Sequence, residues 1–170
     1  MSIMIRAFDP ENTGDIVAVT AIYAYHVTHG TGSFEHVAPS DDEMAARFDL
    51  MTQKAYPILL AIEEGEIIGY AYAGPHKGRK GYDGTVEDSV YVAPSSLGKG
   101  VGRLLLSRLI AEAKAQGYQQ MMAVIGDSEN HASLALHHAL GFTLIGTAKG
   151  IGTKFGRTLD VTYMQIALQD

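Results

Sequence analysis

The feature that most constrains this chain is a glycine-rich turn between a strand and a long helix. Residues 85–92 are rich in β-branched side chains and stop at Ala93-Pro94, as a strand would. Residues 98–102 read Gly-Lys-Gly-Val-Gly, and apolar periodicity over residues 101–116 predicts a helix. Glycines let backbone N–H groups approach a ligand, and a helix N-terminus favours an anion. The pattern predicts a phosphate- or pyrophosphate-binding turn, although a turn whose glycines simply allow positive φ has the same spacing.

Two common phosphate motifs do not fit this turn. A nucleoside triphosphate loop needs Gly-Lys followed by Ser or Thr, whereas Gly98-Lys99 is followed by Gly100. A dinucleotide fingerprint reads G-x-G-x-x-G near the start of a βαβ unit, whereas here the spacing is G-x-G-x-G after residue 90. The remaining candidate is the pyrophosphate loop of acetyl-coenzyme A transferases, which follows a strand with exposed backbone.

Apolar periodicity along the rest of the chain predicts a mixed α/β fold. The order β-α-α-β-β-β-α-β-α-β-β favours a single domain over residues 1–170, with a mainly antiparallel sheet flanked by helices. The helix after the glycine turn has an apolar stripe of Val101, Leu104, Leu105, Leu109 and Ala113. The predicted strands span residues 3–7, 58–62, 67–73, 85–92, 121–125, 142–146 and 159–168. The predicted helices span residues 15–27, about 41–54 and about 101–116, and a short fourth helix ends at Gly141. Ser40 or Asp41 is expected to cap the second helix, and Ser128 or Asn130 the fourth.

Composition excludes several classes of protein. The chain has 170 residues and no cysteine, which removes disulfides, thiolate metal sites and a cysteine nucleophile. A formal net charge of −6 opposes sequence-independent attraction to nucleic acid or anionic membranes. No run of 18 apolar residues occurs, and the first residues do not have the pattern of an apolar leader. These features predict a cytoplasmic protein that binds neither nucleic acid nor membranes.

Several separated motifs together resemble the GCN5-related N-acetyltransferases. They are residues 87–92, the glycine turn at 98–102, Asn130 with Ser133 and His137, and Leu140-Gly141-Phe142, with further matches at residues 33–34, 56–57, 69–71 and 154–157. Within that superfamily the chain looks like the phosphinothricin acetyltransferase family, which includes methionine sulfone and sulfoximine acetyltransferases. The resemblance implies an acyltransferase that uses acetyl-CoA as cosubstrate, needs no metal, acts on a small amine and forms a homodimer.

The resemblance also implies which residues bind the coenzyme, and two departures bear on that site. Superfamily members usually carry Arg or Gln where this chain has Leu97, so a contact to coenzyme A is expected to be missing. Many family members have His where this chain has Asp88. The implied coenzyme-binding residues are Val90, Tyr91, Val92, Gly98, Lys99, Gly100, Val101, Gly102, Arg103, Asn130 and Ser133.

Acetyl transfer to an amine needs a general base, because an amino-acid amine is mostly ammonium at neutral pH. Glu87 matches the glutamate regarded as the family's base, and a solvated strand-end charge is the simpler alternative. Strand alternation places Glu87 and Asp88 on opposite faces, so they are not expected to form a paired carboxylate site. His137 matches a family histidine that could orient Glu87 or assist proton movement. A backbone N–H near Tyr91 or Val92 could polarise the thioester carbonyl.

Basic and aromatic residues suggest how a substrate would be held. Lys77, Arg79 and Lys80 precede the strand that carries Glu87, and a local basic loop could pair with a substrate carboxylate, phosphinate or sulfone oxygen. Lys154 and Arg157 form a second basic cluster. Phe34, Tyr82 and Phe155 could supply apolar walls. The substrate-binding residues implied by the family are Phe34, Lys77, Gly78, Arg79, Glu87, Asp88 and Ser89.

Two alternative functions are compatible with the same residues. The same chemistry could act on a peptide N-terminus or a polyamine, although the basic loops argue against a polycation. A non-catalytic acyl-CoA-binding module is a second alternative, since a fold does not guarantee an activity. Retention of Glu87 favours an enzyme. His26-x-x-His29 and His137-His138 lack a carboxylate that would complete a metal site, so no metal is predicted.

Overall fold

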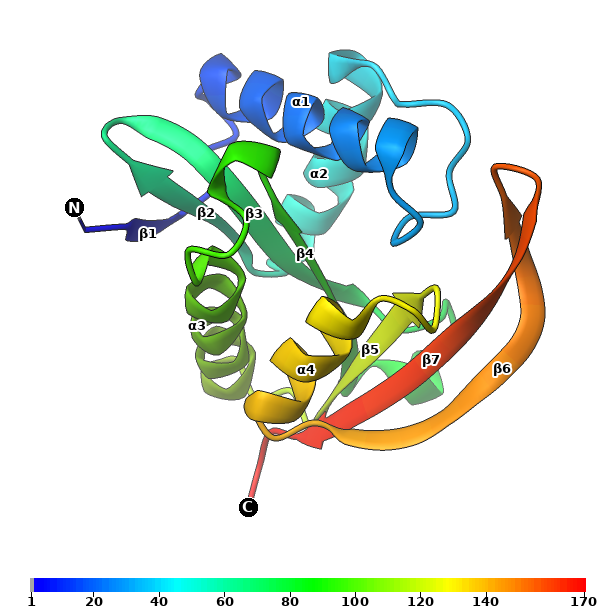
Figure 1. The fold of residues 1–170 in the computed structure, drawn as a ribbon. Coiled ribbons are helices and arrows are strands. Elements are labelled where there is room, and N and C mark those ends of the chain that lie inside the picture. The colour runs from blue at the N-terminus through cyan, green and yellow to red at the C-terminus, as the bar shows by residue number, and fades with distance from the viewer. Residues whose placement is uncertain (1) are drawn as a thin grey trace.

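The computed structural model of the protein describes residues 2–170 as a seven-stranded sheet with helices on both faces (Figure 1). The strand order is β1-β2-β3-β4-β5-β7-β6. The mixed α/β architecture predicted from the sequence is confirmed. The elements are β1 (Met4–Ala7), α1 (Thr13–His29), α2 (Asp41–Gln53), β2 (Ile58–Glu63), β3 (Glu66–Pro75), the 3₁₀ helix η1 (Lys80–Tyr82), β4 (Thr85–Val92), the 3₁₀ helix η2 (Pro94–Ser96), α3 (Val101–Ala115), β5 (Gln120–Gly126), α4 (His131–Ala139), β6 (Thr143–Lys154) and β7 (Arg157–Ala167).

The two faces of the sheet hold two separate apolar cores. Along β2, Leu59 and Ala61 belong to the core beneath α3 and α4, whereas Leu60 belongs to the core beneath α1 and α2. Figure 1 shows these helix pairs on opposite sides of the sheet. Successive side chains of a strand point to opposite faces, so a strand buried on both faces is almost continuously apolar. The run Ile58–Ile62 has this composition because helices cover both of its faces.

One pair of strands decides where a ligand can enter. Neighbouring strands are antiparallel except β4 and β5, which are parallel. Their pairing runs from Thr85 opposite Gln120 to Glu87 opposite Met122, although both strands continue further. Beyond Glu87, therefore, the backbone of β4 is paired with β3 on one edge but not with β5 on the other. The middle of the sheet is split at this point.

Helix starts follow local capping chemistry. The side chains of Asn12 and Ser40 accept hydrogen bonds from backbone N–H groups in the first turns of α1 and α2. Asn130 does the same for α4, so this helix begins after Asn130 rather than after Ser128, the other candidate. The cap of α3 is Gly100, whose φ of 81° lies in the left-handed region that glycine tolerates best. Within residues 2–170, none of the helices is long and apolar enough to cross a membrane.

Two details of the predicted elements are wrong. The strand predicted over residues 142–146 continues as β6 to Lys154, because register shifts against β7 absorb the glycines that looked like a stop. In α3, Leu104 is 44% exposed, whereas Leu106 is fully buried. The buried stripe of α3 therefore includes Leu106 in place of Leu104, on the side where the helix packs across β2, β3 and β4.

Candidate active site

A cavity of about 590 Å³ lies where β4 and β5 separate. Its walls include β4 from Asp88 to Val92 and β5 from Val124 to Gly126, which are the residues just beyond the last paired position. Strand backbone that lacks a neighbouring strand offers N–H and C=O groups to an extended ligand, as in strand addition. Val124 is 41% exposed, and its place on the cavity wall explains why an apolar residue of a central strand is uncovered.

The glycine turn forms one end of this cavity. Gly98 and Gly100 line it, and their φ values of 78° and 81° would strain any residue with a side chain. The helix α3 starts directly after Gly100, so its first backbone N–H groups have no partner within the helix. Val101, Gly102 and Arg103 line the cavity as well. Unpaired N–H groups, the positive end of the helix dipole and one guanidinium together make a site for an anion.

Lys99 lies in the same turn but does not line the cavity. Its Nζ is 3.4 Å from Oε2 of Glu63, with half of the lysine side chain exposed. Leu97 lines the cavity and is 57% exposed. The position where relatives are expected to carry a charged or amide side chain is therefore apolar and open here.

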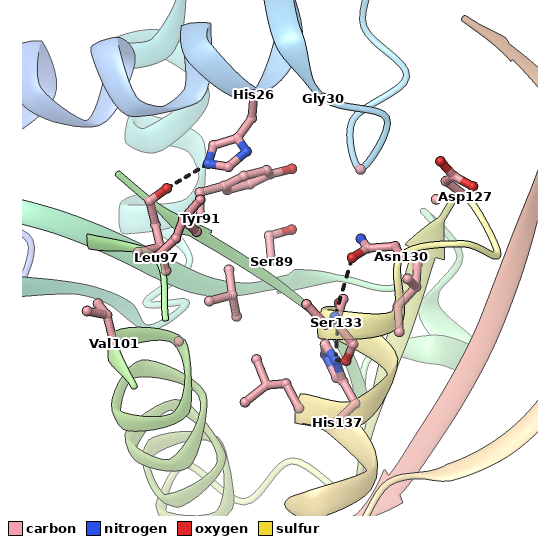
Figure 2. Close-up of a pocket in the computed structure, with 18 of the residues that line it drawn as sticks. His26, Gly30, Ser89, Tyr91, Leu97, Val101, Asp127, Asn130, Ser133 and His137 are labelled. Carbon is pink, nitrogen blue, oxygen red and sulfur yellow. Dashed lines mark hydrogen bonds between the residues drawn. The ribbon is translucent and has the colours of Figure 1, made fainter. Parts of the chain in front are cut away.

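Helix α4 and the loop after α1 complete the walls. Asn130 and Ser133 line the cavity, and Asn130 Oδ1 accepts a hydrogen bond from the Ser133 backbone N–H at 3.3 Å (Figure 2). Gly30 to Gly32 form the facing wall, where the hydroxyl of Thr31 donates to Asp127 at the end of β5. The coenzyme-binding residues predicted from the sequence thus lie around one cavity, with Lys99 as the exception.

His26 is a cavity residue that the sequence did not reveal. Its Nε2 lies 2.7 Å from the backbone carbonyl oxygen of Val92, and Figure 2 shows the ring over the end of β4. A carbonyl oxygen can only accept, so Nε2 carries the hydrogen. The sequence places His26 on a helix far from residue 92, and only the packing of α1 across β4 brings the two together.

His137 is paired with Asp88 and not with Glu87, so the expectation that it could orient Glu87 is wrong. His137 Nε2 lies 2.9 Å from Asp88 Oδ1, and each side chain is 4% exposed. His137 Nδ1 lies 2.7 Å from the carbonyl oxygen of Ser133. Burial lowers the pKa of His137, but the hydrogen bond and the charge of Asp88 outweigh it, so the pKa ends above its usual value of 6.5. The reason is alternation: Asp88 faces α4, and Glu87 faces away.

Glu87 has a different histidine partner, His76, which directly follows β3. His76 Nδ1 lies 2.6 Å from Glu87 Oε2, with side-chain exposures of 14% and 32%. Glu87 is not among the residues lining the cavity, but it is the last β4 residue paired with β5 and directly precedes the first cavity residue, Asp88. It therefore lies at the closed end of the split. The sequence predicted Glu87 but not His76.

The predicted substrate residues are only partly brought together. Asp88 and Ser89 line the cavity, whereas Lys77, Gly78 and Arg79 lie exposed in the loop that leads into η1. Lys77 Nζ lies 5.2 Å from the centre of the Tyr82 ring, a cation–π contact.

Phe34 is partly buried against two glycines, and Lys154 is buried within the chain. A Cβ built on Gly152 would lie 2.1 Å from the Phe34 ring, and one on Gly126 would lie 2.8 Å from it. The ring therefore occupies space that these two glycines leave free. Lys154 is 1% exposed and its Nζ donates to the carbonyl oxygen of Ser33 at 2.6 Å, so it does not form the exposed basic cluster predicted with Arg157.

A polar cluster that the sequence did not indicate lies beneath α1 and α2. The Tyr23 hydroxyl bonds to Glu35 and Ser33, and Arg47 holds both oxygens of Glu35 at 2.7 and 2.9 Å. Burial, followed by the bond to Glu35, raises the pKa of Tyr23 to about 12. The Arg47 hydrogen bonds hold the pKa of Glu35 below its usual value. The Tyr23 ring packs edge-on against Tyr91, so this cluster supports β4 on the side that carries Glu87.

The fold and the site together define a class of ligand. A split sheet with unpaired strand backbone, ending at a glycine turn and a helix N-terminus, suits an elongated molecule with phosphates at one end and amide groups along its length. No group of three or more metal-ligating side chains occurs among residues 2–170.

Comparison with known proteins agrees with this arrangement. The model of the acetyltransferase (GNAT) family matches residues 11–142, and the chain belongs to that family of acyltransferases. It is 49% identical over 151 residues to a phosphinothricin N-acetyltransferase of Alcaligenes faecalis, covering 89% of this chain and 77% of that protein. It is 42% identical over 156 residues to the L-methionine sulfoximine/L-methionine sulfone acetyltransferase of Salmonella typhimurium, covering 92% and 91%. The crystal structure of a phosphinothricin acetyltransferase from Sinorhizobium meliloti in complex with AcCoA superposes with a TM-score of 0.94 at 42% identity, covering 99% and 90%.

Proposed function

We propose that this protein transfers the acetyl group of acetyl-CoA to the α-amino group of a small amino-acid-like molecule of the phosphinothricin, methionine sulfone or methionine sulfoximine type. The observation that carries the proposal is the cavity in the split between β4 and β5, which runs from the glycine turn toward Glu87. Its shape joins an anion site at one end to a carboxylate at the other. The names of the related enzymes supply the substrate class.

In this proposal the pyrophosphate of the coenzyme lies against Gly98, Gly100 and the first turn of α3. The pantetheine arm pairs with the unpaired backbone of β4 and passes Asn130 and Ser133 of α4. The thioester then lies near the closed end of the split, where a backbone N–H of β4 polarises its carbonyl. All of these contacts use backbone or short side chains, so the apolar Leu97 weakens the site without removing it.

Transfer is direct from coenzyme to amine, with Glu87 as the general base. The ammonium group of the substrate gives one proton to Glu87, and the neutral nitrogen forms a bond to the thioester carbonyl carbon. The carbon–sulfur bond breaks, and coenzyme A leaves as the thiol with the second proton of the amine. Glu87 returns its proton to solvent, which its 32% exposure permits.

The basic loop before β4 is proposed to hold the anionic group of the substrate. Two other cationic side chains already have partners within the chain. Arg47 forms ion pairs with Glu35 and Glu43, and Lys154 is buried and donates to the carbonyl oxygen of Ser33. Arg79 is exposed and lies three residues after His76, which touches Glu87. A guanidinium can hold a carboxylate or phosphinate through two parallel hydrogen bonds.

We also propose that the protein is a homodimer, on different grounds. Strand β6 forms one edge of the sheet, and three apolar residues along it, Leu144, Ile145 and Ile151, are 54–65% exposed. An apolar edge strand favours pairing with another chain. Analytical ultracentrifugation of the parent and of Ile151→Lys tests this. A dimer that the substitution dissociates supports the proposal, and a parent that sediments as a monomer contradicts it.

The experiment that tests the activity is a thiol-release screen with acetyl-CoA and a panel of amines. The panel contains methionine sulfone, methionine sulfoximine, phosphinothricin, ordinary amino acids, a short peptide and spermidine. Release with the first three compounds supports the proposal, and preference for the peptide or spermidine favours the alternative amine classes. Coenzyme A binding without release for any amine would favour a binding module.

A companion variant tests where the coenzyme binds. Gly100→Val places a β-branched side chain at a φ of 81° on the cavity wall. Acetyl-CoA affinity measured by calorimetry should weaken by at least about tenfold, or roughly 1.4 kcal/mol. Gly117→Val, at a φ of 86° after α3 and away from the cavity, is the matched control for backbone strain. Unchanged affinity in folded Gly100→Val would contradict the placement.

A further inference from the structure

The hairpin of β3 and β4 brings a histidine to the carboxylate that we propose as the base. Its register places Gly74 opposite Glu87, and His76 is the next residue of the β3 side on the same face. Diagonal neighbours in an antiparallel pair are within reach of long side chains. Gly74 has no side chain that would stand between His76 and Glu87, and the Nδ1–Oε2 distance of 2.6 Å shows a close hydrogen bond.

His76 is held in place independently of Glu87. Its ring meets the Tyr82 ring edge to face, with centroids 5.5 Å apart and an interplanar angle of 84°. The next residue, Lys77, has a φ of 59°, a left-handed conformation uncommon for a residue with a side chain. Lys77 also lies over the Tyr82 ring. A turn and an aromatic contact therefore orient the imidazole before the carboxylate binds it.

The chemistry of the pair fixes which atoms remain free. An ionised carboxylate can only accept hydrogen bonds, so His76 Nδ1 carries the hydrogen and donates it to Oε2. Within residues 2–170, Oε1 of Glu87 is left without a hydrogen-bond partner from the protein. The carboxylate is thus anchored through one oxygen and open at the other.

We infer that His76 is a positioning residue: it anchors Oε2 of Glu87 so that Oε1 is presented to the substrate ammonium as the proton acceptor. This inference rests on the proposed role of Glu87 as base. The sequence motifs did not indicate this role, because His76 belongs neither to the strand motif nor to the glycine turn. A base held in one orientation loses less freedom when the reaction complex forms, and small misplacements of a catalytic group are costly.

A second histidine–glutamate pair, His131 with Glu129, lies in a more exposed environment than His76 with Glu87. His131 Nε2 lies 3.1 Å from Glu129 Oε2, but these side chains are 78% and 74% exposed. Exposed ion pairs contribute little, because water competes for both groups. The His76–Glu87 pair is shorter, more buried and at the closed end of the split. His131→Phe is therefore the matched control for loss of a histidine–carboxylate contact.

The test is a double-mutant cycle with acetyl-CoA and L-methionine sulfoximine as the probe amine. His76→Phe should lower kcat by at least about tenfold, the size expected for one hydrogen bond to a charged group, with little change in the KM for acetyl-CoA. His76→Asn keeps an N–H donor near the place of Nδ1 and should recover kcat to within about threefold of the parent. In the Glu87→Gln background, His76→Phe should have almost no further effect, because the two residues act as one unit. His131→Phe should leave kcat unchanged, and thermal melting checks that each variant folds.

The outcomes separate this inference from the proposed function. Equal losses of kcat in His76→Phe and His76→Asn would overturn the positioning role, as would an undiminished loss in the Glu87→Gln background. Full activity of His76→Phe while Glu87→Gln is slow would overturn the role of His76 and leave Glu87 as the base. Full activity of Glu87→Gln would instead remove the base itself, and with it the reason for the inference.

Discussion

Glu87 and Asp88 are neighbours in the chain, and each bonds to a histidine, but the two pairs lie in different environments. The pair of Glu87 and His76 joins partly exposed side chains at 2.6 Å, whereas the pair of Asp88 and His137 joins side chains that are 4% exposed at 2.9 Å. Strand alternation sends one carboxylate toward a solvent-facing loop and the other toward α4. Similar side chains one residue apart are therefore suited to different tasks.

The free atoms of the two pairs show this difference most clearly. Both ring nitrogens of His137 face acceptors, Asp88 Oδ1 and the Ser133 carbonyl oxygen, so the ring has no nitrogen left for a substrate. Oδ2 of Asp88 is buried without a hydrogen-bond partner among residues 2–170. Glu87, in contrast, keeps one oxygen open on a partly exposed side chain. A carboxylate that must exchange protons with solvent needs the second arrangement, and a buried ion pair that supports α4 has the first.

The largest expected effect separates the two carboxylates by their chemistry. Glu87→Gln preserves shape but removes basicity, so kcat should fall by about 10²–10⁴-fold with acetyl-CoA affinity nearly intact. Asp88→Asn is the matched change on the other face and should lower kcat far less. Steady-state kinetics with calorimetry for the coenzyme checks both. If Glu87→Gln turns over within about threefold of the parent, or Asp88→Asn is the slower enzyme, the assignment of the base to Glu87 is wrong.

The second prediction concerns the stability of the fold, where a change at Asp88 should have a larger effect than a change at Glu87. Asp88→Ala removes the partner of the buried His137, whose ring then becomes neutral because burial lowers its pKa, and leaves one ring nitrogen without a hydrogen bond. This change should cost about 1–3 kcal/mol in the free energy of unfolding. Glu87→Ala removes a partly exposed pair and should cost no more than about 1 kcal/mol. Urea denaturation measures both values. Comparable losses in the two variants would show that the pairs do not differ in the way their burial indicates.

The third prediction is that the substrate binds on the Glu87 side of β4, where Arg79 contacts its carboxylate. Arg79→Ala should weaken transition-state stabilisation by about 1.5–3 kcal/mol for a carboxylate-bearing amine, the range for a hydrogen bond to a charged group. The loss should be much smaller for an amine of similar size that lacks the carboxylate. Values of kcat/KM for methionine sulfone and for its decarboxylated analogue provide the comparison. Equal losses on both amines would mean that Arg79 supports the loop and does not contact the substrate.

The smallest expected effect is a pH dependence of stability from the buried pair. The pKa of His137 is raised in the folded protein, so its contribution is fully present below the unfolded value, near 6.5, and is lost as pH rises through the folded pKa. The stability advantage of the parent over His137→Gln should therefore be larger at pH 6 than at pH 9, as measured by urea midpoints. An advantage that grows with pH would mean that His137 is neutral in the folded state.

Most of the architecture was predictable because it depends on local patterns. Capping residues such as Ser40, the apolar run of β2 and the strand before the glycine turn predicted their elements from short-range chemistry. The extension of β6 to Lys154 was not predictable in this way, because β7 supplies hydrogen bonds that override the glycines. The exposure of Leu104 likewise depends on how α3 lies on the sheet.

In the candidate site, too, the local features were predictable from the sequence and the contacts between distant segments were not. The sequence by itself determined the glycine turn, the strand with Glu87 and the opposite faces of Glu87 and Asp88, since each follows from spacing within one segment. Only the tertiary structure decided that β4 and β5 part after Glu87, that His137 bonds to Asp88 and that His76 bonds to Glu87. These contacts join elements whose relative placement is set by packing across the whole sheet. The position of a histidine in the sequence does not show which carboxylate it will contact in the folded protein.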